Sequence, residues 1–183
     1  MDRFTIHDTP LEGLKCIDRR RAGDERGWFT RFFCREELAL FGGNGAIAQI
    51  NQTLTRLPGT VRGLHFQRAP HAETKLVSCI RGEVFDVAVD LRPNSPTYLK
   101  WHGERLGADN GRALLIPKGF AHGFQTLVAD CELLYLHDVP YAPGAESGVN
   151  PLDPTLAVAW PLPVALLSDR DRALPNVADL QPR

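Results

Sequence analysis

The sequence lacks the features that mark several classes of protein. Its 183 residues include 21 Lys and Arg against 22 Asp and Glu, for a formal net charge of −1, and this balance argues against a strongly basic nucleic-acid-binding surface. The longest weakly polar stretch, residues 156–167, contains two prolines and is too short and too interrupted to span a bilayer. The N-terminus has no apolar segment like that of a secretory signal. We therefore expect no nucleic-acid partner and no membrane partner.

Cysteine is scarce, and its spacing excludes two further kinds of site. The four cysteines, at positions 16, 34, 79 and 131, contain no Cys-x-x-Cys pair. Such scattered thiols fit a reducing cytoplasm better than a disulfide framework or a structural zinc site. With 43% hydrophobic and 23% charged residues, a chain of this length has ordinary globular composition and can bury its own core. We expect one cytoplasmic domain that occupies residues 1–183.

Short alternating runs dominate the remaining sequence. The 16 glycines and 14 prolines are spread along the whole chain and divide it into short pieces. The clearest piece is 82–91, GEVFDVAVDL, in which Phe85, Val87 and Val89 share one face with the period of two that is typical of a strand. Similar strand-like runs occupy 28–33, 46–53, 60–67, 75–81, 98–106, 113–116, 123–127 and 132–138.

Helical signals are few by comparison. Residues 35–41 have a helical pattern, and one helical turn is expected at 168–172. Many short strands at roughly even spacing predict an all-β, antiparallel sandwich or barrel, and a jelly roll at this length. Within the domain we expect N-terminal strands and a short helix over 1–45, a barrel core over 46–160, and a C-terminal arm over 161–183 that lies over the barrel mouth.

One segment has the spacing of a cupin, the small jelly-roll barrel. Gly111, Pro117, Gly119 and His122 match the cupin pattern G-x5-P-x-G-x2-H. A buried histidine of purely structural use is the alternative interpretation of His122. A second match in a strand context, described next, favours a functional histidine.

The other cupin segment begins in the expected way and then departs from the pattern. Gly59 is followed after five residues by His65, but Gln67 and Lys75 stand where the pattern places a second histidine and a glutamate as metal ligands. An ammonium group has no lone pair to offer, and glutamine is a poor ligand for transition metals. The sequence therefore predicts a cupin pocket without a metal.

Histidine and lysine without a metal suit chemistry at a carbon next to a carbonyl group. A neutral imidazole such as His65 can remove a proton from such a carbon, and an ammonium such as Lys75 can stabilise the enolate oxygen. An acid on the opposite face would return a proton with inverted configuration. Tyr135, in the run 132–138, is a candidate for that acid. A carboxylate is also needed to orient His65, and this reasoning alone does not identify it.

The chain resembles the dTDP-4-dehydrorhamnose 3,5-epimerase family over nearly its full length. The resemblance rests on ordered blocks: DERGWF at 24–29, Gln49 and Asn51, RGLHFQ at 62–67, KLV at 75–77, GEVFDVAVDLR at 82–92, SPT at 95–97, IPKGFAHGF at 116–124, Tyr135, Tyr141, Pro143, Glu146, Trp160-Pro161, Leu167-Ser168 and Asp171. It implies a cupin-type antiparallel jelly-roll barrel with short helices, no metal or other cofactor, a dTDP-4-keto-6-deoxyhexose as the substrate, and a homodimer that exchanges N-terminal strands.

The resemblance also implies the roles of four catalytic residues. His65 matches the general base that takes the proton from C3 and C5 of a 4-keto sugar. Asp171 matches the residue that orients His65, which would bring the C-terminal arm back over the barrel. Lys75 matches the group that stabilises the enolate at O4, and Tyr135 matches the acid on the other face.

Ten further positions match contacts to the nucleotide sugar. Tyr141 corresponds to the aromatic residue that stacks on the base, and arginines are the natural partners of a diphosphate. Arg31 stands where the family has a glutamate, and Arg170 stands where it often has a lysine. The expected contacts are Arg26, Phe29, Arg31, Gln49, Asn51, Arg62, His122, Tyr141, Glu146 and Arg170.

Several functions stay open at this point. The leading hypothesis is epimerisation at C3, at C5 or at both carbons in the biosynthesis of dTDP-rhamnose or a related deoxysugar. A single-carbon epimerase for antibiotic or surface-polysaccharide sugars is the alternative within the family. A related nucleotide-sugar enzyme that moves the keto group between C3 and C4, a non-catalytic sugar-binding cupin and a metal-dependent oxygenase are further rivals. The presence of His65, Lys75, Tyr135 and Asp171 together argues against mere sugar binding, which requires none of them.

Overall fold

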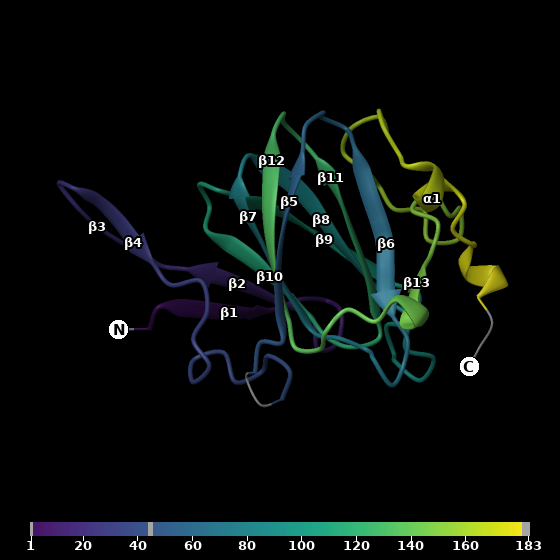
Figure 1. The fold of residues 1–183 in the computed structure, drawn as a ribbon, viewed down its shortest axis with the longest axis horizontal. Coiled ribbons are helices and arrows are strands. Elements are labelled where there is room, and N and C mark those ends of the chain that lie inside the picture. Colours follow the sequence, from purple (N-terminus) through teal and green to yellow (C-terminus); the bar gives the residue numbers. More distant parts are fainter. Residues whose placement is uncertain (1, 44–45, 181–183) are drawn as a thin grey trace.

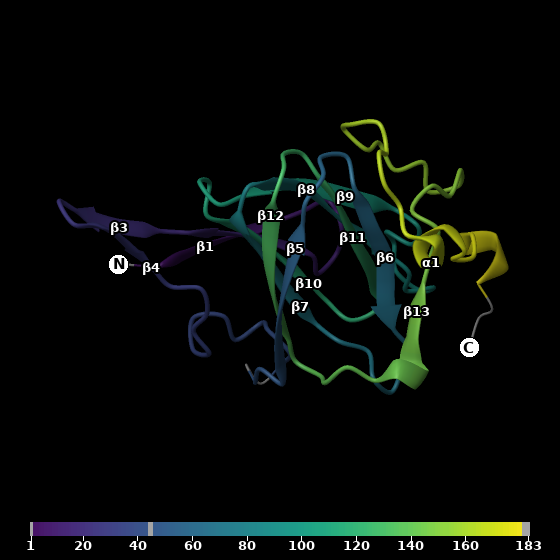
Figure 2. The ribbon, with the colours of Figure 1, turned by 45° about the horizontal axis from the view of Figure 1, so that its top comes forward.

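Short antiparallel strands make up most of the structure, a computed structural model that describes residues 2–43 and 46–180. The first sheet has the order β1 (Phe4–Asp8), β2 (Lys15–Arg19), β10 (Arg112–Ile116), β7 (Lys75–Arg81), β12 (Cys131–His137) and β5 (Gln49–Thr55). The second has the order β13 (Glu146–Gly148), β6 (Val61–Gln67), β11 (Phe120–Thr126), β8 (Glu83–Asp90) and β9 (Trp101–Gly107). The two sheets face each other as a barrel (Figures 1 and 2). This arrangement confirms the predicted all-β jelly roll.

The remaining elements lie outside the two sheets. A hairpin of β3 (Arg21–Asp24) and β4 (Gly27–Thr30) projects away from the barrel (Figure 1, left). The short helices η1 (Pro143–Ala145), α1 (Asp169–Arg172) and η2 (Val177–Asp179) all follow the last long strand. No helix in the described part of the chain is long and apolar enough to cross a membrane.

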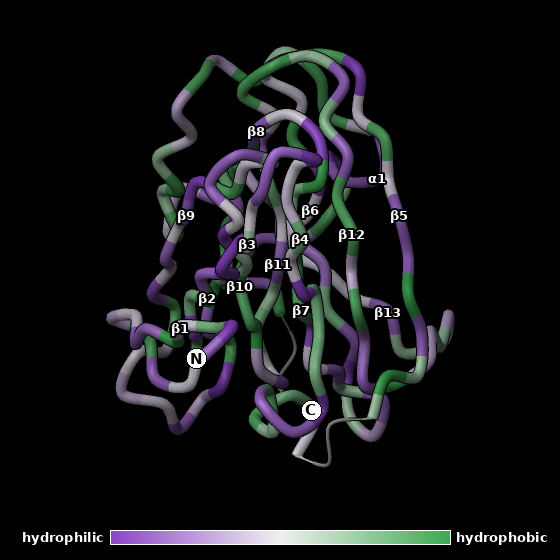
Figure 3. Tube along the Cα trace, turned by 90° about the vertical axis from the view of Figure 1, so that its left-hand side faces the viewer, coloured by the Kyte–Doolittle hydropathy of each residue, from purple (hydrophilic) through white to green (hydrophobic). Residues whose placement is uncertain are grey.

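Apolar residues form one layer between the sheets and one on the outside of each sheet. Val77 and Leu133 of the first sheet meet Val84 and Phe124 of the second in the barrel interior. Hydrophobic and hydrophilic residues alternate along many strands (Figure 3), as an inner and an outer face require. Strand β8 is buried on both faces at most of its positions, which shows that the second sheet is covered on the outside as well.

The segments after β4 and after β13 provide these outer covers. Leu38 and Phe41 pack on the outer face of the first sheet. Val177 and Leu180 pack on the outer face of the second sheet with Leu64 and its neighbours. The C-terminal segment therefore lies along the outside of the second sheet, and α1 contacts β6. The predicted division at residues 45 and 160 stays a prediction.

Most predicted strands are confirmed, and one predicted helix is wrong. The run 75–81 coincides with β7, and the other expected strands are present with shifted ends. Residues 35–41 form turns instead of a helix, with Leu38 N–H bonded to Cys34 O and Phe41 N–H bonded to Leu38 O. Leu38 and Phe41 are three residues apart, as on one face of a helix, because both side chains pack on the outer face of the first sheet. Strands β1, β2, β3 and β13 were not predicted.

Candidate active site

A cavity of about 270 Å³ lies between the two sheets. The first sheet supplies side chains from β5 and β12, and the second supplies side chains from β6 and β11. The lining residues are Asn51, Thr53, Arg62, His65, His122, Gly123, Phe124, Tyr135, His137, Tyr141 and Glu146. Seven of the predicted site residues are in this lining: Asn51, Arg62, His65, His122, Tyr135, Tyr141 and Glu146.

His65 is held by a carboxylate from the C-terminal segment. Its Nε2 lies 2.7 Å from Asp171 Oδ1, and the other carboxylate oxygen accepts the Gly63 N–H at 3.2 Å. Ser168 caps α1 by accepting the Asp171 N–H at 3.0 Å, which fixes the backbone of Asp171. Burial opposes the charge of Asp171, but the bonds from His65, Gly63 and Ser168 outweigh it and hold the pKa of this carboxyl below its ordinary value. Asp171 is therefore an ionised anchor for the ring.

Gly63 allows β6 to approach β11 closely at this point. Its φ of +119° lies in a region that favours glycine, and a Cβ there would lie 2.6 Å from the Gly123 Cα and 2.7 Å from the His122 carbonyl oxygen. In the resulting register His65 stands opposite His122. The close approach of the two strands thus puts two histidines side by side on one wall of the cavity.

His122 binds a carboxyl group that is wholly buried. Its Nε2 lies 2.8 Å from Asp86 Oδ1, and Asp86 Oδ2 has no hydrogen-bond partner among the described residues. Burial raises the pKa of Asp86 above its ordinary value, although His122 and Lys75 act in the opposite direction. Asp86 therefore holds the His122 ring from beneath and does not reach the cavity.

Lys75 lies beside the His65 backbone, outside the lining of the cavity, and is paired with Glu73. Its Nζ is 3.1 Å from Glu73 Oε1 and 3.5 Å from the His65 carbonyl oxygen. The other Glu73 oxygen, Oε2, is 2.8 Å from His137 Nδ1. Burial alone would raise the pKa of Glu73, but the His137 bond and the Lys75 charge outweigh it and lower that pKa. Glu73 is thus an ionised bridge between a lysine and a histidine.

Tyr135 faces the histidines of the second sheet from the opposite wall. Its hydroxyl lies 3.2 Å from Thr53 Oγ1, and its ring meets the edge of His122 at a centroid distance of 6.1 Å. Burial raises the pKa of this phenol far above its ordinary value. The hydroxyl therefore keeps its proton at neutral pH, as an acid must.

A polar network forms the rim of the cavity. Glu146 accepts hydrogen bonds from Tyr141 Oη and from Arg170 Nη2, both at 2.5 Å. Burial opposes the charge of Glu146, but these two bonds outweigh it and lower the pKa of this carboxyl. Gln49 accepts the Tyr141 N–H at 2.9 Å and donates to Asn51 Oδ1 at 3.1 Å. The predicted contacts Gln49 and Arg170 thus join the site through their neighbours.

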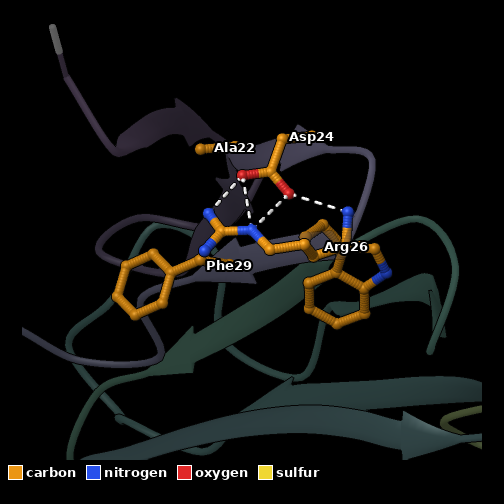
Figure 4. Close-up of a pocket in the computed structure, with 6 residues that line it drawn as sticks. Ala22, Asp24, Arg26 and Phe29 are labelled. Atoms are coloured by element: carbon orange, nitrogen blue, oxygen red, sulfur yellow. Dashed lines mark hydrogen bonds and ion pairs between the residues drawn. The ribbon is translucent and has the colours of Figure 1, made fainter.

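Three predicted contacts lie elsewhere in this chain. Arg26 and Phe29 belong to the projecting hairpin and line a shallow hollow of about 240 Å³ (Figure 4), where Arg26 Nη2 binds Asp24 at 2.5 Å. Phe29 is exposed by 59%. Arg31 follows the hairpin and binds Glu37. Because β3 and β4 point away from the barrel, these residues do not reach the cavity of their own chain.

Four polar residues of the site were not found from the sequence: Thr53, Glu73, Asp86 and His137. His137 carried a usable signal, because it follows Tyr135 at a spacing of two on the same strand. Asp86 alternates with the apolar face of 82–91 in the same way. Glu73 lies in a loop, where no periodic pattern of apolar and polar residues marks it as part of the site. Within residues 2–43 and 46–180, no three His, Cys, Asp or Glu side chains are grouped so that they could hold a metal ion.

Known proteins resemble this chain in sequence and in structure. A family model described as dTDP-4-dehydrorhamnose 3,5-epimerase matches residues 8–179. A protein of that name from Sinorhizobium fredii is 39% identical over 181 residues, which cover 98% of this chain and 93% of the relative. A dTDP-4-dehydrorhamnose 3-epimerase from Streptomyces niveus is 41% identical over 88% of this chain and 78% of the relative.

Solved structures agree with the sequence relatives. The dTDP-6-deoxy-D-glucose-3,5-epimerase of Legionella pneumophila, in complex with dTDP-4-keto-L-rhamnose, matches with a TM-score of 0.90. It is 39% identical in sequence, and the match covers 97% of this chain and 95% of that one.

Proposed function

Because the chain belongs to the dTDP-4-dehydrorhamnose 3,5-epimerase family, we propose that it inverts both C3 and C5 of a dTDP-4-keto-6-deoxyhexose. The protein is an isomerase of the sugar-epimerase type, and its substrate is a nucleotide sugar. One observation supports the catalytic roles that we propose for individual residues: the His65–Asp171 pair lies on one wall of the cavity and Tyr135 lies on the other.

His65 is the base in this proposal. Asp171 is ionised and accepts a hydrogen bond from Nε2, so the ring carries its proton on that nitrogen and Nδ1 is the basic atom. The base takes the proton from the carbon next to the ketone, and the electron pair of the broken C–H bond moves onto O4 as an enolate. Lys75 then stabilises the negative oxygen, as a cation in a site of low dielectric does well.

Tyr135 is the acid that completes the inversion. It donates its hydroxyl proton to the opposite face of the enolate carbon, which restores the ketone and leaves a phenolate. The proton gained by His65 and the proton lost by Tyr135 balance, and exchange with solvent returns both groups to their starting state. The buried phenol carries its proton at neutral pH and so holds it ready for the enolate carbon.

The other rim residues suit the nucleotide half. We propose that Arg62 binds the diphosphate, since arginine pairs well with phosphate oxygens, and that Tyr141 stacks on the base. Tyr141 is exposed by 51% at the rim, and the Glu146 bond holds its side chain. His122, Gln49, Asn51, Glu146 and Arg170 complete the proposed substrate contacts.

In a homodimer, the projecting hairpin could contact the partner chain. Trp28 and Phe29 are exposed by 58% and 59% on β4, so the hairpin presents two large aromatic side chains that a second chain could cover. We propose that two chains exchange these hairpins, so that Arg26, Phe29 and Arg31 serve the cavity of the partner. A cytoplasmic location stays a prediction from the cysteine usage.

The residues at the two positions where a metal-binding cupin has ligands support chemistry without a metal. Gln67 and Lys75 stand where a metal-binding cupin has ligands, and both are engaged: the Gln67 amide accepts the Ala142 N–H and donates to the His71 carbonyl, and Lys75 is paired with Glu73. A second candidate function is epimerisation at C3 alone, which the relative from Streptomyces niveus favours.

Incubation with dTDP-4-keto-6-deoxyglucose in deuterated water tests the proposal. Deuterium at both C3 and C5, with inverted product, is the expected result. Deuterium at C3 alone would establish the single-carbon epimerase instead. If the protein catalysed exchange at neither carbon, the proposed function would be wrong.

A further inference from the structure

The mechanism above leaves one carboxylate–imidazole pair of the cavity without a role. Glu73 Oε2 lies 2.8 Å from His137 Nδ1, and Glu73 Oε1 lies 3.1 Å from Lys75 Nζ. Lys75 and His137 stand directly opposite each other on the neighbouring strands β7 and β12. The side chains of Glu73, His137 and Lys75 are 9%, 10% and 10% exposed. A buried carboxylate thus holds two proton donors at once.

This arrangement fixes which nitrogen of His137 carries the proton. Glu73 is ionised and only accepts hydrogen bonds, so His137 donates from Nδ1, and in the neutral ring Nε2 has the lone pair. The amide of Asn51 is oriented consistently with a lone pair on Nε2. Its donor atom, Nδ2, lies 3.5 Å from His137 Nε2, while its oxygen, Oδ1, accepts a hydrogen bond from Gln49. At that length the Asn51 contact is at the outer limit of a hydrogen bond. Nε2 is therefore an acceptor without a close donor among residues 2–43 and 46–180.

The surroundings of His137 indicate which part of the substrate it meets. Its ring stacks on Tyr135 with a centroid distance of 6.3 Å and an angle of 23°, and Lys75 is its cross-strand neighbour. Both neighbours are assigned above to the reacting carbon and to O4. A ketone oxygen and an ionised diphosphate cannot donate a hydrogen bond, whereas a sugar hydroxyl can. The chemistry of Nε2 therefore matches a hydroxyl of the sugar half.

We propose that His137 is a further substrate-contacting residue, which accepts a hydrogen bond from a sugar hydroxyl at Nε2, and that Glu73 is the positioning residue that holds both its ring and Lys75. This inference rests on the proposed function, because it takes the sugar half of the substrate to lie beside Tyr135 and Lys75.

Two substitutions of His137 separate contact with the sugar from a purely structural pairing with Glu73. His137→Asn keeps a donor near the position of Nδ1 and removes the group at Nε2. His137→Gln reaches the position of Nε2 with an amide oxygen and gives up the bond to Glu73. The measurements are steady-state kinetics with dTDP-4-keto-6-deoxyglucose, calorimetric binding of dTDP, and thermal unfolding to show that each variant is folded.

We expect His137→Asn to raise KM roughly 3- to 10-fold, the effect of one lost neutral hydrogen bond, with kcat close to that of the parent. Affinity for dTDP, which has no sugar half, should be unchanged. His137→Gln should show a smaller rise in KM. An unchanged KM in His137→Asn would overturn the inference, and so would an equal loss of affinity for dTDP.

Glu73→Gln provides the readout for positioning. Glu73 accepts from His137 and from Lys75 at two separate oxygens, whereas glutamine has one acceptor oxygen, a donating amide and no charge, so it cannot hold both groups in the same way. We expect kcat to fall by about 10-fold or more, because the enolate loses a fixed cation. A kcat equal to that of the parent would show that Glu73 does not position Lys75. Deuterium exchange by the parent enzyme separates a failure of this inference from a failure of the proposed function. If the parent catalyses exchange and His137→Asn has the same kinetics as the parent, only this inference is wrong. If the parent catalyses no exchange, the proposed function itself is wrong.

Discussion

Three histidines line the cavity, and the pKa of the carboxyl group behind the ring is lowered at two of them and raised at the third. The pKa values of Asp171 and Glu73 are lowered, so both carboxylates are ionised, while burial raises the pKa of Asp86 behind His122. An ionised carboxylate stabilises the protonated ring more strongly than a neutral acid does. The side chain of His65 is 32% exposed, against 6% for His122. His65 thus combines a charged anchor with access to the substrate.

Replacing the base should stop the chemistry and spare binding. We expect His65→Ala to reduce exchange at both carbons by about 10²- to 10⁴-fold, the usual contribution of a general base, with little change in affinity for dTDP. Asp171→Asn should reduce turnover less, because the ring is still present but is oriented poorly. Deuterium exchange and dTDP calorimetry on both variants measure this. Near-full turnover in His65→Ala would show that another group is the base.

Replacing the acid should separate exchange from inversion. Tyr135→Phe keeps His65 and Lys75, so the enolate should still form, but it would be reprotonated mostly on its original face. Deuterium should then enter the substrate carbons faster than inverted product appears, and the ratio of exchange to inversion should rise above that of the parent. If exchange and inversion fall together, Tyr135 shapes the pocket and the acid is another residue.

At the scale of elements, β6 and β11 position the site because their backbones meet at glycines. Gly63 has a φ of +119°, and a Cβ added to it would lie 2.6 Å from the Gly123 Cα, which leaves no room for a side chain. Gly43, with φ of +74° and no atom within 4 Å of an added Cβ, provides a matched comparison that has the backbone strain without the clash.

Gly63→Ala should therefore cost more stability than Gly43→Ala. We expect about 1–2 kcal/mol for Gly43→Ala from backbone strain alone, and about 3 kcal/mol or more for Gly63→Ala, because overpacking adds to the strain. Gly63→Ala should also lose activity, since Asp171 binds the Gly63 N–H. Urea denaturation of both variants measures the difference, and equal losses would show that β6 can move away without cost.

Regular strands could be predicted from local pattern, whereas contacts between distant segments could not. The period of two located β7 and β8 because each has a continuous inner face. Strand β1 was missed because it is short and has only two apolar residues, Phe4 and Ile6, of which only Phe4 is buried. The pairing of His65 with Asp171 joins positions 106 residues apart, and only the family resemblance pointed to it. Glu73 lies in a loop and joined the site through tertiary packing alone.

At the scale of the whole molecule, buried polar clusters tie the loops to the barrel. Asp90, at the end of β8, accepts bonds from Arg92 Nη2 at 2.7 Å and from Thr97 Oγ1 at 2.6 Å, and Ser95 also donates to it. Burial opposes the charge of Asp90, but these bonds outweigh it and lower its pKa from 3.8 to about 2. The carboxylate therefore binds the loop after β8 in its charged form.

This cluster should make stability depend on pH in acid. Because the pKa of Asp90 is lower in the folded chain than in the unfolded chain, its contribution is present above about pH 4 and is lost as the pH falls through about 2. Asp90→Asn should reduce the free energy of unfolding by on the order of 1–2 kcal/mol at pH 7. The gap between parent and variant should close between pH 4 and pH 2.

Urea denaturation from pH 2 to pH 7 measures that gap. Asp109→Asn, at an exposed position in the turn after β9, is the matched control and should follow the parent throughout. A gap between the parent and Asp90→Asn that persists at pH 2 would show that the side chain acts through its shape and not through its charge.

The distance along the chain between His65 and Asp171 also matters while the protein is being made. At roughly 5–20 residues per second of translation, the 106 intervening residues mean that His65 leaves the ribosome about 5 to 20 s before its carboxylate partner does. Both sheets of the barrel are complete in sequence before α1 is. The strands that line the cavity therefore leave the ribosome before the carboxylate that orients His65 does.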